Sequence, residues 1–580
     1  MPSDPHRRVM RTTGLGASAI CLAGMLAWTT TVTALQAGLL PHKQLVPTAG
    51  ELGQLARVRS LLATSTKENP NPVHIVFYGQ SITLEPWWRK VASELRRMYP
   101  DALLTIENKA IAGFQDWALF RTVDADLVPI QPDLVVLHAY GNGTGTDLML
   151  GELRAKTVTD VLLQTDQVHG FDRMDEETDP AKIVYEDLLP YRNYVALPAA
   201  ARRNDACLAR IRDLWKAYLR TNDLPAEAML SDASVHLNDD GNDLLAEFVL
   251  SYLEPGGWAE PIDPWNVPRV RTAVVGKDVR WRDGELECSF VGSVVAVVLQ
   301  GVLPSDIDVL VDGQRPADRP ELYGFSRTSA SHFNGWPALS RVGSEAPLVV
   351  ERWFMAPSDV SADGLRFNFK VWGSVTGPDG EGTSTDRFVS KSGRVVIEPG
   401  DHWIGRAVAF GHLPVPPGYT TYWDVERRFV ERLDEGTGAP YGSGGMVTLA
   451  LGLSDEPHRL RLVARDGRGG GIRAVRAFSP KGSAVARSVA DDPPPAGTLL
   501  VRQGPAGVSV VWILTDEDGR SGWRLEHSQQ FGRNASWRPI PTRIIQKSPD
   551  IRVAPVEDPP PFGYYRLAPA PKPVNPGRPQ

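Results

Sequence analysis

A serine, a glycine, an asparagine and a histidine that follows an aspartate lie in four separate stretches of the first half of this chain. Ser81, Gly113 and Asn142 come shortly after short apolar runs, and three residues separate Asp232 from His236. A serine becomes a nucleophile when a histidine takes its proton, a carboxylate orients the histidine, and N–H donors face the oxyanion that forms. If the fold brings these residues together, they could hydrolyse an acyl group.

Ser81 follows a glycine turn. The apolar segment Val73–Tyr78 ends in Gly79, Gln80 and Ser81. Glycine permits a sharp turn, and open α/β sheets bind their ligands at the carboxyl ends of their strands. The backbone N–H of Ser81 would open a helix and could face an oxyanion. A strand-to-helix turn with a capping serine has the same sequence, so this stretch alone does not separate the two interpretations.

Each of the other candidates also has a structural alternative. Gly113 could simply end a strand, Asn142 could cap or turn the chain, and Asp232 could cap a helix. In the functional interpretation Gly113 supplies a backbone donor, Asn142 supplies an amide donor, and Asp232 orients His236. Their joint order along the chain, at successive strand ends, favours the functional interpretation.

Residues 38–258 alternate strand-like and helix-like apolar patterns. This alternation predicts a parallel sheet covered by helices on both faces. The predicted strands are Val73–Tyr78, Leu103–Glu107, Pro132–His138 and Thr159–Gln164, and the predicted helices are Leu52–Leu62, Trp87–Tyr99, Arg210–Arg220 and Asp240–Leu253.

Over roughly residues 70 to 255, this order of a serine turn, a glycine, an asparagine and Asp…His before the last helix resembles the SGNH (GDSL-like) hydrolase superfamily. The resemblance implies a flavodoxin-like three-layer α/β/α sandwich. It implies that Ser81 is the nucleophile and that His236 is the base, with Asp232 behind it. It also implies that Gly113 and Asn142 join the N–H of Ser81 as oxyanion donors, with no metal or organic cofactor.

The chain departs from the family pattern at three places. Gln80 stands where an acidic residue usually precedes the serine, and Gly141 directly precedes Asn142 where the family has Gly-x-Asn-Asp. Three residues rather than two lie between Asp232 and His236. A backbone carbonyl or another carboxylate could therefore orient His236 in place of Asp232.

Three polar residues near the predicted strand ends are candidates for substrate contact. Gln80 precedes the serine, His138 ends a predicted strand, and His169 follows Thr159–Gln164, where folds of this kind build substrate loops. For His138, a structural place in the wall of the site is the stronger interpretation.

The character of the sequence changes after Pro255, where helical periodicity ends and turn pairs recur. Residues 265–485 predict a β-sandwich, residues 497–568 a small β domain, and residues 569–580 a disordered proline-rich tail. The first unit resembles a jelly-roll module found beside carbohydrate esterases, and the second resembles a β domain common at the ends of secreted bacterial proteins.

Exposed tryptophans in these β units would suit sugar stacking. For most of Trp336, Trp353, Trp403 and Trp423, a place in the core is the preferred interpretation.

The amino-terminal residues 1–37 predict an export signal. Arg7, Arg8 and Arg11 precede the uncharged segment Thr13–Ala34, which ends in small residues. An uncleaved membrane anchor is the alternative, because the apolar segment approaches the length of a spanning helix. The net charge of -7 argues against a nucleic-acid partner, and 3 cysteines in the chain do not make a disulfide framework.

Together these patterns predict an exported serine esterase that removes acetyl or similar groups from a carbohydrate. The alternatives are an acyltransferase that uses the same residues and a non-catalytic glycan-binding surface protein. The expected partner is an acylated carbohydrate or another small ester, with glycan or cell-surface contact through the β domains. The sequence does not indicate the oligomeric state.

Overall fold

The computed structural model describes residues 47–480, apart from residue 233 and residues 256–259, 332–334, 406–413 and 435–444. Between residues 499 and 569 it describes the backbone of further strands. The predicted signal segment 1–37 and residues 570–580 of the predicted tail lie outside the described residues. Within the described part of the chain, no helix has the length and apolar character needed to cross a membrane.

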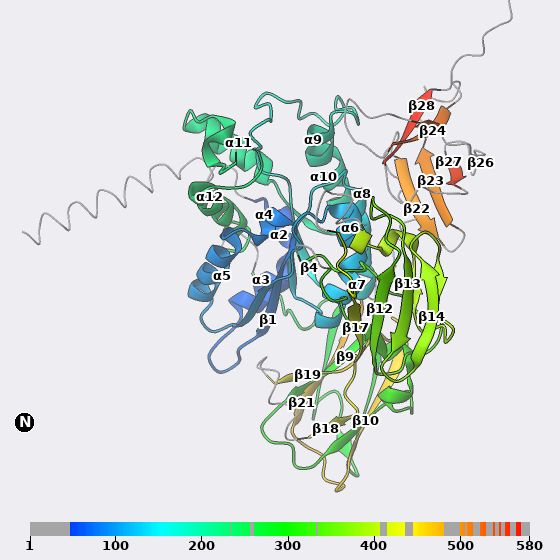
Figure 1. Ribbon diagram of the computed structural model, residues 1–580. Helices are drawn as coiled ribbons and strands as arrows, with labels where there is room; N and C mark the ends of the chain where they lie inside the picture. The colour runs from blue at the N-terminus through cyan, green and yellow to red at the C-terminus, as the bar shows by residue number, and fades with distance from the viewer. Residues whose placement is uncertain are drawn as a thin grey trace, which may run out of the picture.

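A five-stranded parallel sheet forms the centre of the first domain (Figure 1). Its strand order is β2-β1-β3-β4-β5, so the chain leaves β1 toward one edge and later returns to its other side at β3. In open parallel sheets, ligands bind at this reversal, outside the carboxyl ends of the strands. The strands are β1 (Pro72–Gly79), β2 (Leu103–Asn108), β3 (Leu134–His138), β4 (Asp160–Gln164) and β5 (Cys207–Ala209).

Alternate side chains of the sheet enter two separate cores. Ile75 and Phe77 belong to one core, whereas Val76 and Tyr78 belong to the other. The first core includes residues of α3 (Ala56–Ala63), α5 (Trp87–Met98), α11 (Ile211–Thr221) and α12 (Asp239–Leu250). The second includes residues of α6 (Asp116–Leu119), α8 (Thr144–Lys156) and α10 (Leu197–Arg203). The prediction of a parallel sheet between two layers of helices is confirmed. The remaining short helices are α2 (Ala49–Gly53), α4 (Ser81–Leu84), α7 (Val123–Asp126) and α9 (Leu188–Pro190).

Two antiparallel sheets follow and share a core of their own. Their strand orders are β18-β10-β20-β8-β7 and β19-β9-β21-β6. The second sheet also packs against the α/β domain, because Val294, Ala296 and Phe478 join its first core. The strands are β6 (Val270–Val274), β7 (Trp281–Arg282), β8 (Glu285–Val291), β9 (Val294–Leu299), β10 (Ile307–Val311), β18 (Arg432–Leu433), β19 (Met446–Leu451), β20 (Pro457–Ala464) and β21 (Ile472–Phe478).

Between β10 and β18 the chain forms a further sheet, which we call the inserted unit (residues 323–427). Its strand order is β11-β17-β12-β13-β14, with a separate pair of β15 and β16, and it has a core of its own. The segment 265–485, predicted as one β-sandwich, therefore holds two cores. The strands are β11 (Tyr323–Phe325), β12 (Arg352–Ser358), β13 (Asn368–Gly373), β14 (Gly377–Thr383), β15 (Phe388–Val389), β16 (Val396–Ile397) and β17 (Thr421–Arg427).

The four tryptophans considered for sugar stacking are buried. Trp353 and Trp423 lie in the core of the inserted unit. Trp336 and Trp403 join the second core of the α/β domain instead. The preferred interpretation of these residues as core is confirmed, and two of them lie in the contact between the two parts of the molecule.

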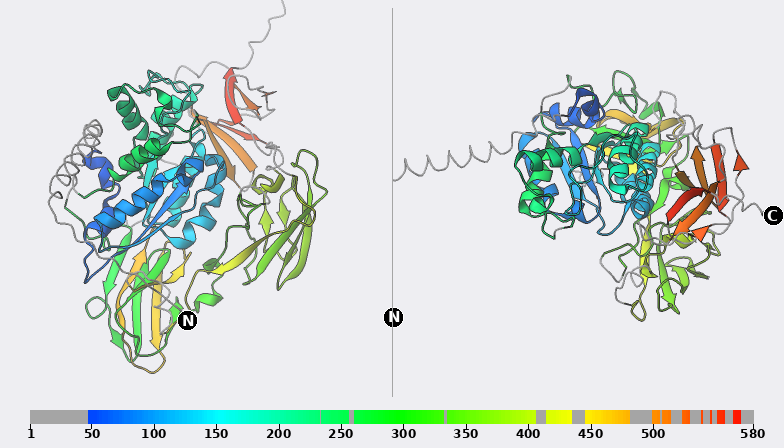
Figure 2. Two further views of the ribbon diagram at one scale, coloured as in Figure 1. Left: turned by 60° about the vertical axis from the view of Figure 1, so that its left-hand side comes forward. Right: turned by 90° about the horizontal axis from the view of Figure 1, so that it is seen from above.

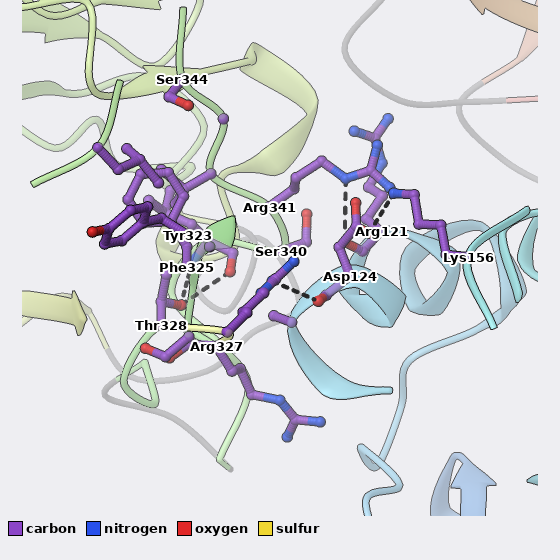
Figure 3. Close-up of a pocket in the computed structure, with 18 residues that line it drawn as sticks. Arg121, Asp124, Lys156, Tyr323, Phe325, Arg327, Thr328, Ser340, Arg341 and Ser344 are labelled. Atoms are coloured by element: carbon purple, nitrogen blue, oxygen red, sulfur yellow. Dashed lines mark hydrogen bonds and ion pairs between the residues drawn. The ribbon is translucent and has the colours of Figure 1, made fainter. Parts of the chain in front are cut away.

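Ion pairs hold the inserted unit against the α/β domain. Arg327 contacts Asp126 over 2.6 Å. Arg121 of the α/β domain contacts Asp401 over 2.9 Å. A cavity of about 240 Å³ lies between the two parts and is lined by residues of both, including Arg121, Arg327 and Lys156 (Figure 3). Lys156 pairs with Asp124, so these three cations of the cavity are neutralised by carboxylates.

Two small antiparallel sheets lie in the segment predicted as the last β domain. Their strand orders are β22-β23-β27-β26 and β25-β24-β28. The strands are β22 (Leu499–Gly504), β23 (Gly507–Ile513), β24 (Trp523–Ser528), β25 (Arg538–Pro539), β26 (Ile545–Gln546), β27 (Ile551–Val556) and β28 (Tyr564–Pro569).

Candidate active site

Ser81 lies at the carboxyl end of β1 and is the first residue of α4. The turn before it needs a glycine, because a Cβ atom on Gly79 would lie 2.0 Å from the carbonyl oxygen of His138 in the neighbouring strand. The backbones of β1 and β3 are therefore in close contact just before the serine. This geometry places Ser81 at the reversal of the sheet, where ligands are expected.

The structure brings Ser81, His236 and Asp232 together in one chain of contacts. Nε2 of His236 lies 3.3 Å from Oγ of Ser81, and Nδ1 of His236 lies 2.5 Å from Oδ2 of Asp232. Because a carboxylate accepts hydrogen bonds, Nδ1 carries the proton in neutral His236 and Nε2 is left to accept one from the serine. Contacts of this length shorten when a ligand completes such a site.

Asp232 is fixed by the loop that it belongs to. Its Oδ1 accepts hydrogen bonds from the backbone N–H groups of Ser234, Val235 and His236, at 2.9, 3.1 and 3.1 Å. The hydrogen bond from His236 is the main cause that holds the pKa of Asp232 well below its usual range. The tight turn makes the spacing of three intervening residues compatible with a direct contact between carboxylate and imidazole.

The His236 loop is open to solvent. The side chain of His236 is 44% exposed and that of Asp232 is 37% exposed. The bridge between Leu230 and Leu237 closes the loop, and Asn238 then caps α12 by accepting a hydrogen bond from the N–H of Gly241. The loop is thus held at its base, while the polar groups at its tip face outward.

Gly113 lies in the loop between β2 and α6, with φ of 77°. Its loop runs along the end of β1, because the N–H of Ile111 donates to the carbonyl oxygen of Gly79 over 2.9 Å. Among the described residues, neither the N–H of Gly113 nor that of Ser81 has a hydrogen-bond partner. Both N–H groups therefore remain available to a ligand.

A residue of the inserted unit fixes this loop. Nε1 of Trp336 donates a hydrogen bond to the carbonyl oxygen of Ala112 over 2.6 Å. The indole also lies against Gly113, where an added Cβ atom would be 3.1 Å from the ring. The ring of Phe114 packs edge-on against Trp336, at a centroid distance of 5.7 Å. No pattern in the sequence connects Trp336 to the Gly113 loop, because 222 intervening residues separate them and the contact depends on how the two units dock.

Asn142 lies between two glycines with positive φ, Gly141 at 143° and Gly143 at 90°. Its Oδ1 accepts from the N–H of Thr144 over 3.0 Å, which orients the amide, and its Nδ2 lies 3.5 Å from the hydroxyl of Tyr185. The glycine that directly precedes Asn142, a departure from the family pattern, is thus part of a sharply turned loop.

Asp116 holds the Asn142 loop in place from behind. Its Oδ2 accepts from the N–H of Gly143 over 2.9 Å and from the N–H of Thr146 over 3.3 Å. A Cβ atom on Gly141 would lie 1.9 Å from Oδ1 of Asp116, so only glycine fits there. Burial raises the pKa of Asp116. Asp116 was not among the residues singled out in the sequence.

The three residues predicted to contact substrate are all buried: Gln80, His138 and His169 are 3%, 3% and 2% exposed. In the amide orientation that satisfies both of its ends, Gln80 donates to the carbonyl oxygen of Phe114 and accepts from the N–H of Tyr140. Gln80 therefore ties together the loops that carry Gly113 and Asn142.

His138 belongs to a buried polar cluster around Asp166. Its Nε2 lies 3.1 Å from Oδ1 of Asp166. The other carboxylate oxygen of Asp166, Oδ2, accepts hydrogen bonds from Arg192 and Asn193. Burial lowers the pKa of His138, against the opposing effect of its hydrogen bond to Asp166. Burial alone would raise the pKa of Asp166, but Arg192 and His138 outweigh it and hold that pKa below its usual range. Arg192 in turn donates to the carbonyl oxygen of Gly141, so the cluster supports the Asn142 loop.

His169 lies on the other side of the same cluster. Its Nε2 is 3.2 Å from the hydroxyl of Tyr140. The amide of Gln167 donates both to that hydroxyl, over 2.8 Å, and to the carbonyl oxygen of Val235, over 2.7 Å. Since Val235 directly precedes His236, the buried network reaches the loop of the candidate base.

Glu85, which follows α4, also contacts the loop that carries His236. Its Oε2 accepts a hydrogen bond from the N–H of Leu237 over 3.1 Å. Burial raises the pKa of Glu85 to about 7, and the nearby His236 opposes the rise. A carboxyl that titrates near neutrality therefore lies beside His236, at a position that no sequence motif indicated.

Comparison with known proteins gives no match to a family model and no match to a curated protein. The chain is similar to the solved structure of Axe2, an acetylxylan esterase from Geobacillus stearothermophilus, at 18% identity and a TM-score of 0.27, over 32% of this chain and 96% of the other. It is also similar to a two-domain esterase active on acetylated mannans, at 13% identity and a TM-score of 0.27, over 74% of this chain and 96% of the other. A protein from Parabacteroides merdae described as a GDSL-like lipase shares 16% identity at a TM-score of 0.27, over 32% of this chain and 99% of the other.

Proposed function

We propose that this protein is a serine esterase of the SGNH type that removes acyl groups, such as acetyl, from a carbohydrate. The observation that carries the proposal is the chain of contacts from Ser81 through His236 to Asp232 at the end of β1, with spacings of 3.3 and 2.5 Å. The available N–H groups of Ser81 and Gly113, together with the Asn142 amide, support it as an oxyanion site.

The reaction begins when Oγ of Ser81 attacks the ester carbonyl and passes its proton to Nε2 of His236. The N–H groups of Ser81 and Gly113 and the amide of Asn142 stabilise the tetrahedral oxyanion. The bond to the sugar oxygen then breaks, and His236 returns the proton to that oxygen. Asp232 keeps Nδ1 protonated and stabilises the imidazolium while His236 holds the proton.

Water completes the reaction. His236 takes a proton from a water molecule, the resulting hydroxide attacks the acyl group on Ser81, and a second oxyanion forms in the same site. When the bond to Oγ breaks, His236 gives the proton back to Ser81 and the free carboxylic acid leaves. Each step uses groups of this chain and water alone.

The exposure of the site supports a polymeric substrate. With His236 and Asp232 both more than one third exposed, an acyl group on a long chain can reach Ser81 without the chain entering a closed pocket. The resemblance to carbohydrate esterases supports a sugar as the alcohol. Acetylated xylan and acetylated mannan, named for the solved structures above, are the first polymers to test.

The decisive experiment is hydrolysis of p-nitrophenyl acetate by the wild type and by Ser81→Ala. We expect Ser81→Ala to lose the activity, and incubation of the wild type with a fluorophosphonate to label Ser81. Equal rates for the two proteins would exclude this mechanism. Acetate released from the two polymers then tests the carbohydrate part of the proposal separately.

A further inference from the structure

Three aromatic side chains form a row across one face of the inserted unit. Tyr422 of β17 is paired with Phe354 of β12, and Phe354 is paired on its other side with Trp372 of β13. Directly paired residues project from the same face of a sheet, so the three rings are neighbours. The rings of Phe354 and Trp372 are nearly parallel, at 12°, with centroids 5.4 Å apart. We call Tyr422, Phe354 and Trp372 the aromatic row.

The aromatic row faces away from the core of its sheet. The residues adjacent to it in the chain, Trp353 and Trp423, are fully buried, whereas Tyr422 is 42% exposed. Phe354 and Trp372 are half-buried, and the exposed Pro378 pairs with Trp372 on the far side. In Figure 2 the sheet of the inserted unit, in yellow-green, lies at the periphery of the molecule.

Charged residues flank the row in compensated pairs. On one side Arg352 contacts Asp424 over 2.7 Å, and its guanidinium lies 4.5 Å from the centre of the Tyr422 ring. On the other side Lys370 contacts Glu381 over 3.1 Å. The face thus offers aromatic surface and many hydrogen-bonding groups, and Arg352 and Lys370 are each paired with a carboxylate.

We propose that the aromatic row binds a neutral polysaccharide chain that lies across strands β17, β12 and β13. Pyranose rings have an apolar face of C–H groups, which stacks on aromatic rings, and a rim of hydroxyls, which exchange hydrogen bonds with charged side chains. Neighbouring strands lie about 4.8 Å apart, which is close to the length of one sugar unit in an extended chain, so successive sugars meet successive rings.

The balance of charge selects this occupant. An anionic polymer or a membrane surface would need a surplus of cations, and Arg352 and Lys370 are each already paired with a carboxylate. The hydroxyls of a neutral glycan, by contrast, can form hydrogen bonds with both the cation and the carboxylate of each ion pair. The choice of a glycan rests on the proposed function, but binding at the row does not involve Ser81. A second binding site on the same chain raises the local concentration of substrate at the first.

The test uses the full-length protein with Ser81→Ala, so that the ligand is not altered during the measurement. Binding to soluble acetylated glucomannan, and to the same polymer after alkaline deacetylation, is measured by affinity electrophoresis. We expect binding to both, since the row contacts sugar rings and not acetyl groups. Adding Trp372→Ala or Tyr422→Ala should weaken binding about tenfold, the effect of losing one stacked ring.

Val302→Ala is the matched control, because Val302 is an exposed apolar residue of the other β unit and should leave binding unchanged. Circular dichroism shows whether the variants fold. If Trp372→Ala does not fold, Tyr422→Ala, at the most exposed position of the row, still tests the proposal. Unchanged affinity of a folded Tyr422→Ala or Trp372→Ala, or no binding of either polymer, would overturn the proposal. With Ser81 present, the row variants should hydrolyse p-nitrophenyl acetate at the wild-type rate, so a failure of the row and a failure of the esterase proposal give different results.

Discussion

The indole nitrogen of Trp336 donates a hydrogen bond over 2.6 Å to the carbonyl oxygen of Ala112, a residue 224 positions earlier in the chain. Ala112 directly precedes Gly113, whose N–H we propose as an oxyanion donor. The inserted unit therefore contributes to the geometry of a site that lies in another domain, although none of its described strands reaches the parallel sheet. Trp336 is a positioning residue in this scheme.

Replacing Trp336 tests this role. Trp336→Phe removes the hydrogen bond but keeps an aromatic ring against Gly113. We expect kcat for p-nitrophenyl acetate to fall about 3- to 10-fold, with KM nearly unchanged, because the loop would act on the transition state more than on the bound ester. Trp372→Ala, on the far face of the same unit, is the control. A lower melting temperature with unchanged kcat would show that Trp336 only stabilises the interface.

Asp232→Asn tests the orienting carboxylate. The amide keeps the shape of the side chain but cannot hold a positive charge on His236, so we expect kcat/KM to fall about 100- to 10,000-fold. Asp232 stays ionised well below neutral pH, because the bond from His236 depresses its pKa. A plot of kcat/KM against pH for the wild type should therefore show no loss from protonation of Asp232 near pH 4. Asp239→Asn removes the same charge at an exposed position at the start of α12, and it should leave kcat/KM and its pH dependence unaltered.

Glu85→Gln tests the buried carboxyl beside His236. Burial raises the pKa of Glu85 in the folded protein to about 7, from an ordinary value of 4.5. The folded state thus binds the proton more tightly than the unfolded state, and the contribution of Glu85 to stability is present below about pH 4.5 and is lost as the pH rises through about 7. Glutamine does not titrate, so the free energy of unfolding of Glu85→Gln relative to wild type should be higher at pH 8 than at pH 4.5. Urea denaturation at both pH values measures this, and Glu68→Gln, the same change at an exposed position, is the control.

Asn142→Ala tests the side-chain oxyanion donor. Loss of one such donor costs about 100- to 1000-fold in turnover. Tyr185→Phe removes only the hydroxyl that lies 3.5 Å from the Asn142 amide, and it should change kcat by less than about threefold. If Asn142→Ala keeps wild-type kcat, the oxyanion is stabilised by the two backbone N–H groups alone.

The α/β domain was largely predictable from sequence. Short apolar runs such as Val73–Tyr78 correspond to strands because a strand covered on both faces must be apolar throughout. The order of Ser81, Gly113, Asn142 and His236 predicts one candidate site, because parallel strands bring their carboxyl ends to one edge of the sheet. The short β5 was missed, since three residues carry no distinguishable period.

What the sequence did not indicate depends on contacts between distant segments. Gln80, His138 and His169 are candidates for substrate contact because they lie near strand ends, and for His138 a structural place was the stronger interpretation. A position along the chain does not show which way a side chain points. All three side chains are buried, and each has a polar contact with a buried group: Gln80 with Phe114 and Tyr140, His138 with Asp166, and His169 with Tyr140. The border between the β-sandwich and the inserted unit was missed for a related reason, because short strands joined by turns look alike whichever sheet they join.

The pairing of β10 with β18 bears on how the inserted unit could have been acquired in evolution. They pair directly, with Ile307 opposite Leu433, although the whole inserted unit lies between them in sequence. The two ends of the insertion therefore leave from one point of the sandwich, and a single genetic event can add or delete it without breaking either sheet. Such an event would change the support of Gly113 and the aromatic row together, so the proposed oxyanion donor and the proposed glycan-binding surface would be altered in one step.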